Sequence, residues 1–243
     1  MFLAGMAATG ARNSHVLRQW AANYHYFSFH QAPLLGVLLS NLDPADIGTL
    51  TEVSTALFEE FGSGRVEQAH SRLFARFCSA LGIEERALPI SPTDVEPEVS
   101  AYLTFIEGAY RSDIPGFALG AYCFLERSAV QSYPIMLSAF RQLGFDEDEL
   151  IFFSTHVIQE AGHDAGAVRI AEQSIHSEVQ LAGFSQGLRL GSSAWSRVWH
   201  RFDALRSSAG SDVRASIATP DKLLNLDNTM PAKHPMSVAT DET

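Results

Sequence analysis

The chain contains very little cysteine and almost no lysine. Cys78 and Cys123 are the only cysteines among 243 residues, and they form neither a CxxC pair nor a disulfide framework. We therefore expect a reducing, cytoplasmic location. Lysine occurs only at Lys222 and Lys233, in the C-terminal segment, which argues against a Schiff-base lysine buried inside a domain.

Positive charge and long apolar runs are also scarce. Lysine and arginine total 17 against 28 acidic residues, a net charge of −11. Phosphate backbones and anionic lipids require a positive surface, so this balance argues against nucleic acid and membranes as partners. No apolar run reaches the roughly 18 residues that a transmembrane helix needs, and no GxxxxGKS phosphate loop occurs. The expected partner is a small-molecule substrate. The sequence does not decide whether the chain also forms a homodimer.

The pattern of hydrophobic residues is helical along most of the chain. Hydrophobic residues make up 46% of the sequence and charged residues 19%, which is enough apolar material for a folded core. No segment alternates apolar and polar residues as a half-buried strand does. Apolar spacing, prolines and glycines predict helices near 14–29, 34–42, 44–62, 65–81, 98–110, 114–130, 133–143, 146–175 and 178–206.

These elements predict one all-α domain with a segment on either side. Residues 14–206 are expected to form a single bundle of seven to nine helices. The first ten residues are apolar and no positive region precedes Arg12, so we expect residues 1–13 to form an N-terminal extension and not a signal peptide. Residues 207–243 are rich in Ser, Asp, Thr and Pro and are expected to form a mobile tail.

The strongest chemical signal is the string FSTHVIQEAGHDAG. His156, Glu160 and His163 are four and three residues apart, which places them within an arc of about 60° on one helix face. The rest of that face is apolar, and two imidazoles with a carboxylate are costly to bury there unless they are paired. A divalent metal would pair them, because it binds neutral imidazole and carboxylate together. The alternative is an exposed His/Glu face.

A second signal lies in EEFGSGRVEQAHSRLF. His70 shares an apolar helix face with phenylalanine and leucine residues, and Glu67 precedes it by three residues on that face. Glu60 precedes His70 by ten residues, across the Gly62–Gly64 break, which could fold the preceding helix end back towards His70. Either glutamate could equally be an ordinary solvated residue.

The third signal is Glu126 in GFALGAYCFLERSAV. This carboxyl group follows a nearly unbroken apolar run, so it must be protonated, hydrogen-bonded or metal-bound. Cys123, one turn earlier, is interpreted as a small buried hydrophobe and not as a catalytic thiol. Together the three helices offer more nitrogen and oxygen ligands than one ion needs. Such a set without thiolate suits iron or manganese, and its size suits two ions about 3.5–4 Å apart.

His70, Glu126 and the His-x3-Glu-x2-His cluster, in that order, resemble the haem-oxygenase-like non-haem di-iron oxidases and oxygenases. The resemblance extends over about residues 15–205 and includes the branches that form para-aminobenzoate and undecene. It implies a haem-oxygenase-like fold, two Fe²⁺ ions and O₂ as co-substrate. The implied metal ligands are Glu60, Glu67, His70, Glu126, His156, Glu160 and His163. Ser63 stands where some relatives have the first glutamate. Glu60 and Glu67 are therefore both candidates for that ligand, and Glu60 is slightly preferred.

The resemblance also implies a type of reaction. The substrate would be a small amino-acid-like compound or carboxylic acid, which undergoes N-oxygenation, oxidative C–C cleavage or desaturation in a biosynthetic pathway. Glu126 and Glu160 are the expected catalytic residues. Arg169 is a candidate for binding a substrate carboxylate, although it lies about 120° from His163 on a regular helix. Tyr122, one turn before Glu126, is the second substrate-binding candidate.

Two other functions are compatible with a helical domain. A metal-independent thiaminase-like or pyrroloquinoline-quinone-synthase-like enzyme would use Glu126 or Cys123 as acid, base or nucleophile. The His-x3-Glu-x2-His cluster argues against the thiaminase branch, which needs no such set. A non-enzymatic helical binding protein would instead expose its histidines to a partner.

Overall fold

The computed structural model describes residues 2, 5, 12 and 14–217, without the side chains of 160, 161, 163, 164 and 209–217. By contacts the chain divides into two units, residues 1–207 and 208–243. The fold described below is that of the first unit. No helix among the described residues is both long and apolar enough to cross a membrane.

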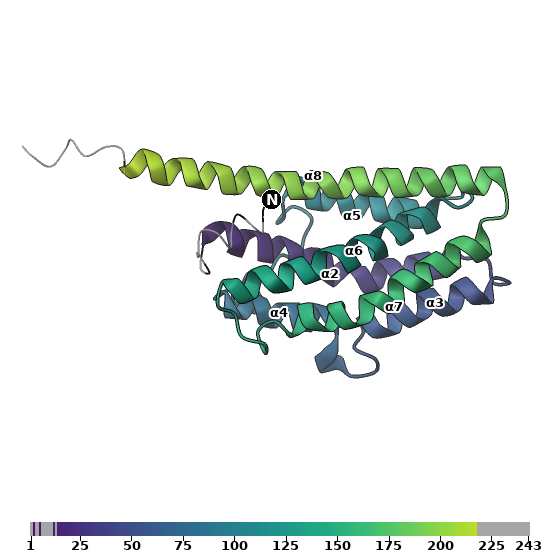
Figure 1. Cartoon of the computed structure of the whole chain (residues 1–243), viewed down its shortest axis with the longest axis horizontal. Helices are drawn as coiled ribbons and strands as arrows, with labels where there is room; N and C mark the ends of the chain where they lie inside the picture. The colour runs from purple at the N-terminus through teal and green to yellow at the C-terminus, as the bar shows by residue number, and fades with distance from the viewer. Residues whose placement is uncertain (1, 3–4, 6–11, 13, 218–243) are drawn as a thin grey trace, which may run out of the picture. The chain divides into compact units, whose positions relative to one another are not determined.

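Seven α-helices and two short 3₁₀ helices make up the described part of the chain, which contains no strand (Figure 1). The all-α prediction is therefore confirmed. In chain order the elements are α2 (His15–Asn41), α3 (Ile47–Glu60), η1 (Val66–Gln68), α4 (His70–Ala80), η2 (Glu85–Ala87), α5 (Pro97–Tyr110), α6 (Phe117–Gln142), α7 (Ile151–Ser174) and α8 (Glu178–Ile217).

Aromatic side chains form the core between α2, α4, α6 and α7. The ring of Phe74 on α4 lies 4.8 Å from Phe152 on α7 and 5.1 Å from Tyr24 on α2. Phe153 on α7 lies 4.8 Å from Phe140 on α6. Such offset and edge-to-face contacts stabilise a core beyond the burial of apolar area. They fix the inward faces of α4 and α7, from which the metal-binding candidates project.

Two helices that were predicted to break at prolines are continuous. Pro33 lies inside α2 and Pro134 lies inside α6. A proline in a helix interior removes one backbone hydrogen bond and costs about 3 kcal/mol in isolation. Here Leu34 and Leu35 continue the buried face of α2, and Met136 and Phe140 continue that of α6. Burial on both sides of each proline outweighs the local cost, so the predicted breaks at these positions are wrong.

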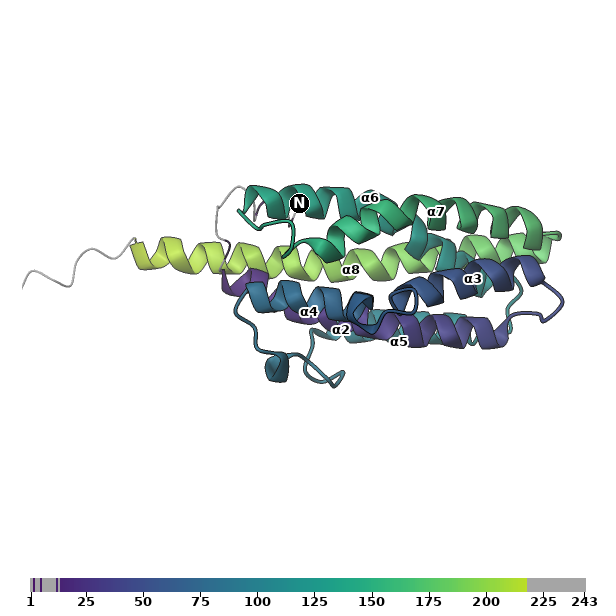
Figure 2. The same ribbon diagram turned by 90° about the horizontal axis from the view of Figure 1, so that it is seen from below.

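Glycines bring α6 and α8 into backbone contact. A Cβ atom on Gly120 of α6 would lie 2.0 Å from the carbonyl oxygen of Phe184, and one on Gly187 of α8 would lie 2.2 Å from that of Phe117. No side chain larger than hydrogen fits at such distances. Figure 1 shows α8 running along one edge of the bundle, beside α5 and α6, and Figure 2 shows the same bundle from below. On its other side, the ring of Trp195 lies 4.8 Å from that of Tyr102 on α5.

Candidate metal centre

The turn between α3 and α4 reverses the chain beside the core. Gly62, Ser63 and Gly64 have φ angles of 77°, 52° and 84°, in the left-handed region that favours glycine. At Gly62 a Cβ atom would also lie 2.3 Å from the carbonyl oxygen of Arg65, so only glycine fits. The turn places Glu60, the last residue of α3, next to His70, the first residue of α4. The folding back that the Gly62–Gly64 break suggested is present.

His70 and Glu60 form a close contact at this turn. Nδ1 of His70 lies 3.2 Å from Oε1 of Glu60, which is ion-pair distance. His70 is only 1% exposed. A carboxylate beside a buried imidazole is the arrangement by which proteins bind a cation or hold a protonated ring.

His156 approaches the same point from α7. Its Nδ1 lies 2.8 Å from the carbonyl oxygen of Phe152, one turn earlier. A carbonyl only accepts hydrogen bonds, so we assign the proton of the neutral ring to Nδ1 and its lone pair to Nε2. A backbone carbonyl on the second ring nitrogen is the usual way in which proteins orient a metal-binding histidine. The ring centre of His156 lies 4.2 Å from that of His70, and His156 is 4% exposed.

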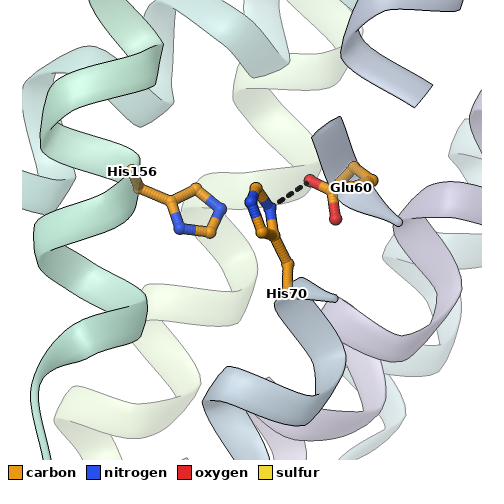
Figure 3. Close-up of side chains that lie close together, drawn as sticks. All are labelled: Glu60, His70 and His156. Carbon is orange, nitrogen blue, oxygen red and sulfur yellow. Dashed lines mark ion pairs between the residues drawn. The ribbon is translucent and has the colours of Figure 1, made fainter. Parts of the chain in front are cut away.

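Three candidate ligands from three helices therefore converge on one point. Each of Glu60, His70 and His156 offers a ligand atom, and these atoms all lie within 4.8 Å of one another. Figure 3 shows His156 reaching from α7 towards His70, with Glu60 on the far side of the His70 ring. Two imidazoles and one carboxylate, all buried or half-buried, fit a divalent iron, manganese or zinc ion. The residues present fit the metal that the sequence pattern suggested.

Glu126 faces the same region from α6. It is 6% exposed and lines a small cavity of about 40 Å³ together with Glu60 and His156. A second carboxylate on the cavity adds the oxygen ligands that a second ion would need.

Tyr133 also lines this cavity, and sequence reasoning did not assign it to the site. Its ring centre lies 4.1 Å from that of His156, and its hydroxyl accepts a hydrogen bond of 3.3 Å from Tyr24. The signal was its spacing of seven residues from Glu126, two turns along one helix face. That signal was hidden because a helix break was expected at Pro134.

The structure separates Glu67 and Arg169 from these residues. The side chain of Glu67 is exposed in η1, and its backbone oxygen accepts a hydrogen bond from Arg76. Arg169 on α7 forms an ion pair with Glu52 of α3, with 2.8 Å between Nη2 and Oε1. Its guanidinium is thus engaged outside the small cavity, whose lining includes neither Arg169 nor Glu67.

The remaining candidate residues lie on α6 and α7. Tyr122 is buried on α6 and does not line the small cavity. Glu160 and His163 belong to α7, but their side chains lie outside the described residues. Cys123 is buried, and its thiol donates to the carbonyl oxygen of Ala167 at 3.3 Å. The non-enzymatic alternative requires exposed histidines, whereas His70 and His156 are buried.

Comparison with known proteins agrees with this arrangement. A family model described as "iron-containing redox enzyme" matches residues 18–196. The crystal structure of a CADD-like protein of unknown function from Nostoc punctiforme PCC 73102 is similar, with a TM-score of 0.66 and 19% identity. The match covers 83% of this chain and 86% of that one, and at this identity it concerns the fold alone. No curated protein matches the chain. The predicted haem-oxygenase-like bundle is confirmed.

Proposed function

The chain belongs to the family of iron-containing redox enzymes, and from that premise we propose that it is a non-haem di-iron oxidase or oxygenase. In this proposal O₂ is the co-substrate, and a small amino-acid-like compound or carboxylic acid is oxidised in the cytoplasm. One observation supports the proposal above the others. Glu60, His70 and His156 come from three separate helices, and their ligand atoms gather within 4.8 Å inside the bundle.

The proposed ligand set draws on four helices. Glu60 on α3, His70 on α4, Glu126 on α6 and His156 on α7 would hold the irons, and Glu160 and His163 of α7 would complete the set. Bound iron supplies the one-electron chemistry with O₂ that amino-acid side chains lack. Histidine and carboxylate ligands suit this role, because iron sites built from them keep coordination positions open for O₂ or substrate.

The protein's own residues position the ligands and keep water out. The carbonyl of Phe152 holds the His156 ring in one orientation. The ring of Phe152 lies 4.2 Å from that of His156, and the ring of Tyr133 lies 4.1 Å from it. These rings leave only a small cavity, in which Glu126 presents its carboxylate oxygens. We assign Glu126 the transfer of a proton within this cavity, where bulk water does not compete.

Anaerobic titration of the full chain with Fe(II), followed by addition of O₂, tests the proposal. We expect about two irons for each chain, in line with two-metal sites, and a transient visible absorption band after mixing with O₂. His156→Ala should lose iron and O₂ uptake, whereas His200→Ala, at an exposed histidine of α8, should match the parent. An absence of bound iron in the parent, or an unchanged His156→Ala variant, would refute the proposal.

A further inference from the structure

A second, larger cavity opens between α2, α4 and the segment that contains η2. Its volume is about 570 Å³, which lies in the range of small-molecule sites. It has no lining residue in common with the cavity at the metal centre. The residues that matter for its chemistry are His25, Phe29, Arg72, Glu85, Leu88 and Ile90.

His25 is a buried polar group that lacks a hydrogen bond among the described residues. The residue is 8% exposed, and its Nδ1 is buried without a partner. His30, on the same helix, satisfies its Nδ1 with the carbonyl oxygen of Tyr26 at 2.7 Å. Burial lowers the pKa of His25 to about 4 against an opposing effect of Glu85, so the ring is neutral at pH 7. A neutral imidazole on the lining can contact a ligand without the cost of desolvating a charge.

The cavity also carries one cation and one anion that do not pair with each other. Neither Arg72 on α4 nor Glu85 in η2 forms an ion pair with any residue that the structure describes. The neighbours of Glu85 behave differently, because Arg86 pairs with Glu84 at 2.5 Å. Two opposite charges on the lining of one cavity are suited to a ligand that carries both signs.

Apolar side chains flank these charges at the cavity. Ile90 is 90% exposed and Phe29 is more than half exposed, although both are large hydrophobic residues. The backbone around Ile90 is held in place, because Asp94 accepts a hydrogen bond of 3.0 Å from the backbone of Ser91. Phe29 and Ile90 therefore offer apolar surface to a ligand beside the charged residues of the cavity.

We propose that this cavity binds a free amino acid with an apolar side chain, at a site separate from the metal centre. Arg72 would bind the carboxylate and Glu85 the ammonium group. Phe29, Leu88 and Ile90 would cover the side chain of the ligand. The ring of His25 lines the same cavity and would pack against the side chain of the ligand. The assignment depends on residues of α2, α4 and η2 and holds whether or not the chain is an oxidase.

Calorimetric titration of the full chain with three probes tests the charge requirement. L-Phenylalanine carries both charges, phenylpropionate only the carboxylate, and phenethylamine only the ammonium group. We expect L-phenylalanine to bind about tenfold more tightly than either single-charge probe, as the loss of one ion contact predicts. Equal affinity for phenylpropionate would overturn the proposal in favour of a carboxylate site. No heat of binding with L-phenylalanine or L-leucine up to about 10 mM, a very weak affinity, would overturn it altogether.

Four exposed positions provide matched variants that leave the core intact. Arg72→Gln and Glu85→Gln should each weaken L-phenylalanine binding about tenfold, as expected for one charged contact. Arg76→Gln on the same helix and Glu84→Gln in the same segment should bind like the parent, because neither residue lines the cavity.

The nitrogen NMR signal of His25 should shift on binding. His156→Ala should keep full affinity, which separates this proposal from the oxidase. Unchanged affinity in both Arg72→Gln and Glu85→Gln would refute it.

Discussion

Nδ1 of His70 and Oε1 of Glu60 lie 3.2 Å apart, although the two residues are ten positions apart in sequence. Glu60 ends α3 and His70 begins α4, and the segment between them contains three consecutive residues with positive φ. The turn between α3 and α4 therefore brings Glu60 within ion-pair distance of His70. The geometry of the turn decides which glutamate reaches the buried histidine.

This turn predicts different effects at the two candidate glutamates. Glu60→Gln should weaken Fe(II) binding at least about tenfold, because it removes a charged ligand from the group around His70. Glu67→Gln should leave iron affinity within about twofold of the parent, a difference well under 1 kcal/mol, since its side chain is exposed. Anaerobic titration of both variants measures the contrast. The reverse order of affinities would move the ligand to Glu67.

Gly62→Ala should destabilise the protein and weaken the metal site together. An alanine there adds backbone strain at positive φ, about 1–2 kcal/mol, and a Cβ that would contact the Arg65 carbonyl. Gly82 also has positive φ, but nothing lies within 4 Å of its Cβ position. Gly82→Ala is thus a control for strain alone. Denaturant unfolding should show a larger loss of unfolding free energy for Gly62→Ala, and equal losses would contradict the close contact.

Glu126→Ala should abolish O₂ consumption while the helical circular dichroism signal stays largely intact. The carboxyl group lines the small cavity, so its removal deletes the proposed ligand and proton carrier. Glu107→Ala, at an exposed residue that pairs with Arg111, should consume oxygen at the parent rate. An oxygen electrode measures both. If Glu126→Ala keeps the parent rate, Glu126 is not part of the centre.

The free energy of unfolding should fall as the pH decreases from 6.5 towards 4 because of His25. Its pKa is lowered from 6.5 to about 4, mainly by burial, with Glu85 acting in the opposite direction. In this window the unfolded chain binds a proton that the folded chain does not, so acid favours unfolding. The depressed pKa corresponds to about 3 kcal/mol at most. Denaturant unfolding at several pH values should show a flatter profile for His25→Gln, whereas parallel profiles would contradict the shift.

Periodicity alone predicted most of the fold. Apolar spacing identified the helical segments, and Gly62, Gly82 and Gly144 mark chain reversals with positive φ near predicted helix ends. The last helix was expected to end near residue 206, but α8 continues to Ile217. Two further errors lie at Pro33 and Pro134, where a local rule predicted breaks. Long-range burial on both sides decided those two positions, and a single sequence does not display it.

The site was predictable in its residue types but not in its details. Buried polar residues on apolar faces identified His70, Glu126 and His156, because the cost of burial makes such positions informative. Spacing could not choose between Glu60 and Glu67, since that choice depends on the path of a turn. The ion pair between Arg169 and Glu52 joins two helices that are far apart in sequence. Such partnerships leave no local pattern.

The glycine contacts between α6 and α8 have a mechanical consequence. Where Gly120 and Gly187 bring two backbones together, rotation or sliding of either helix by one residue would drive a side chain into the opposite main chain. The close contact thus fixes α6 and α8 in a single register relative to each other. A motion that admits a substrate therefore leaves α6 and α8 in register, and the two helices move as one body or not at all.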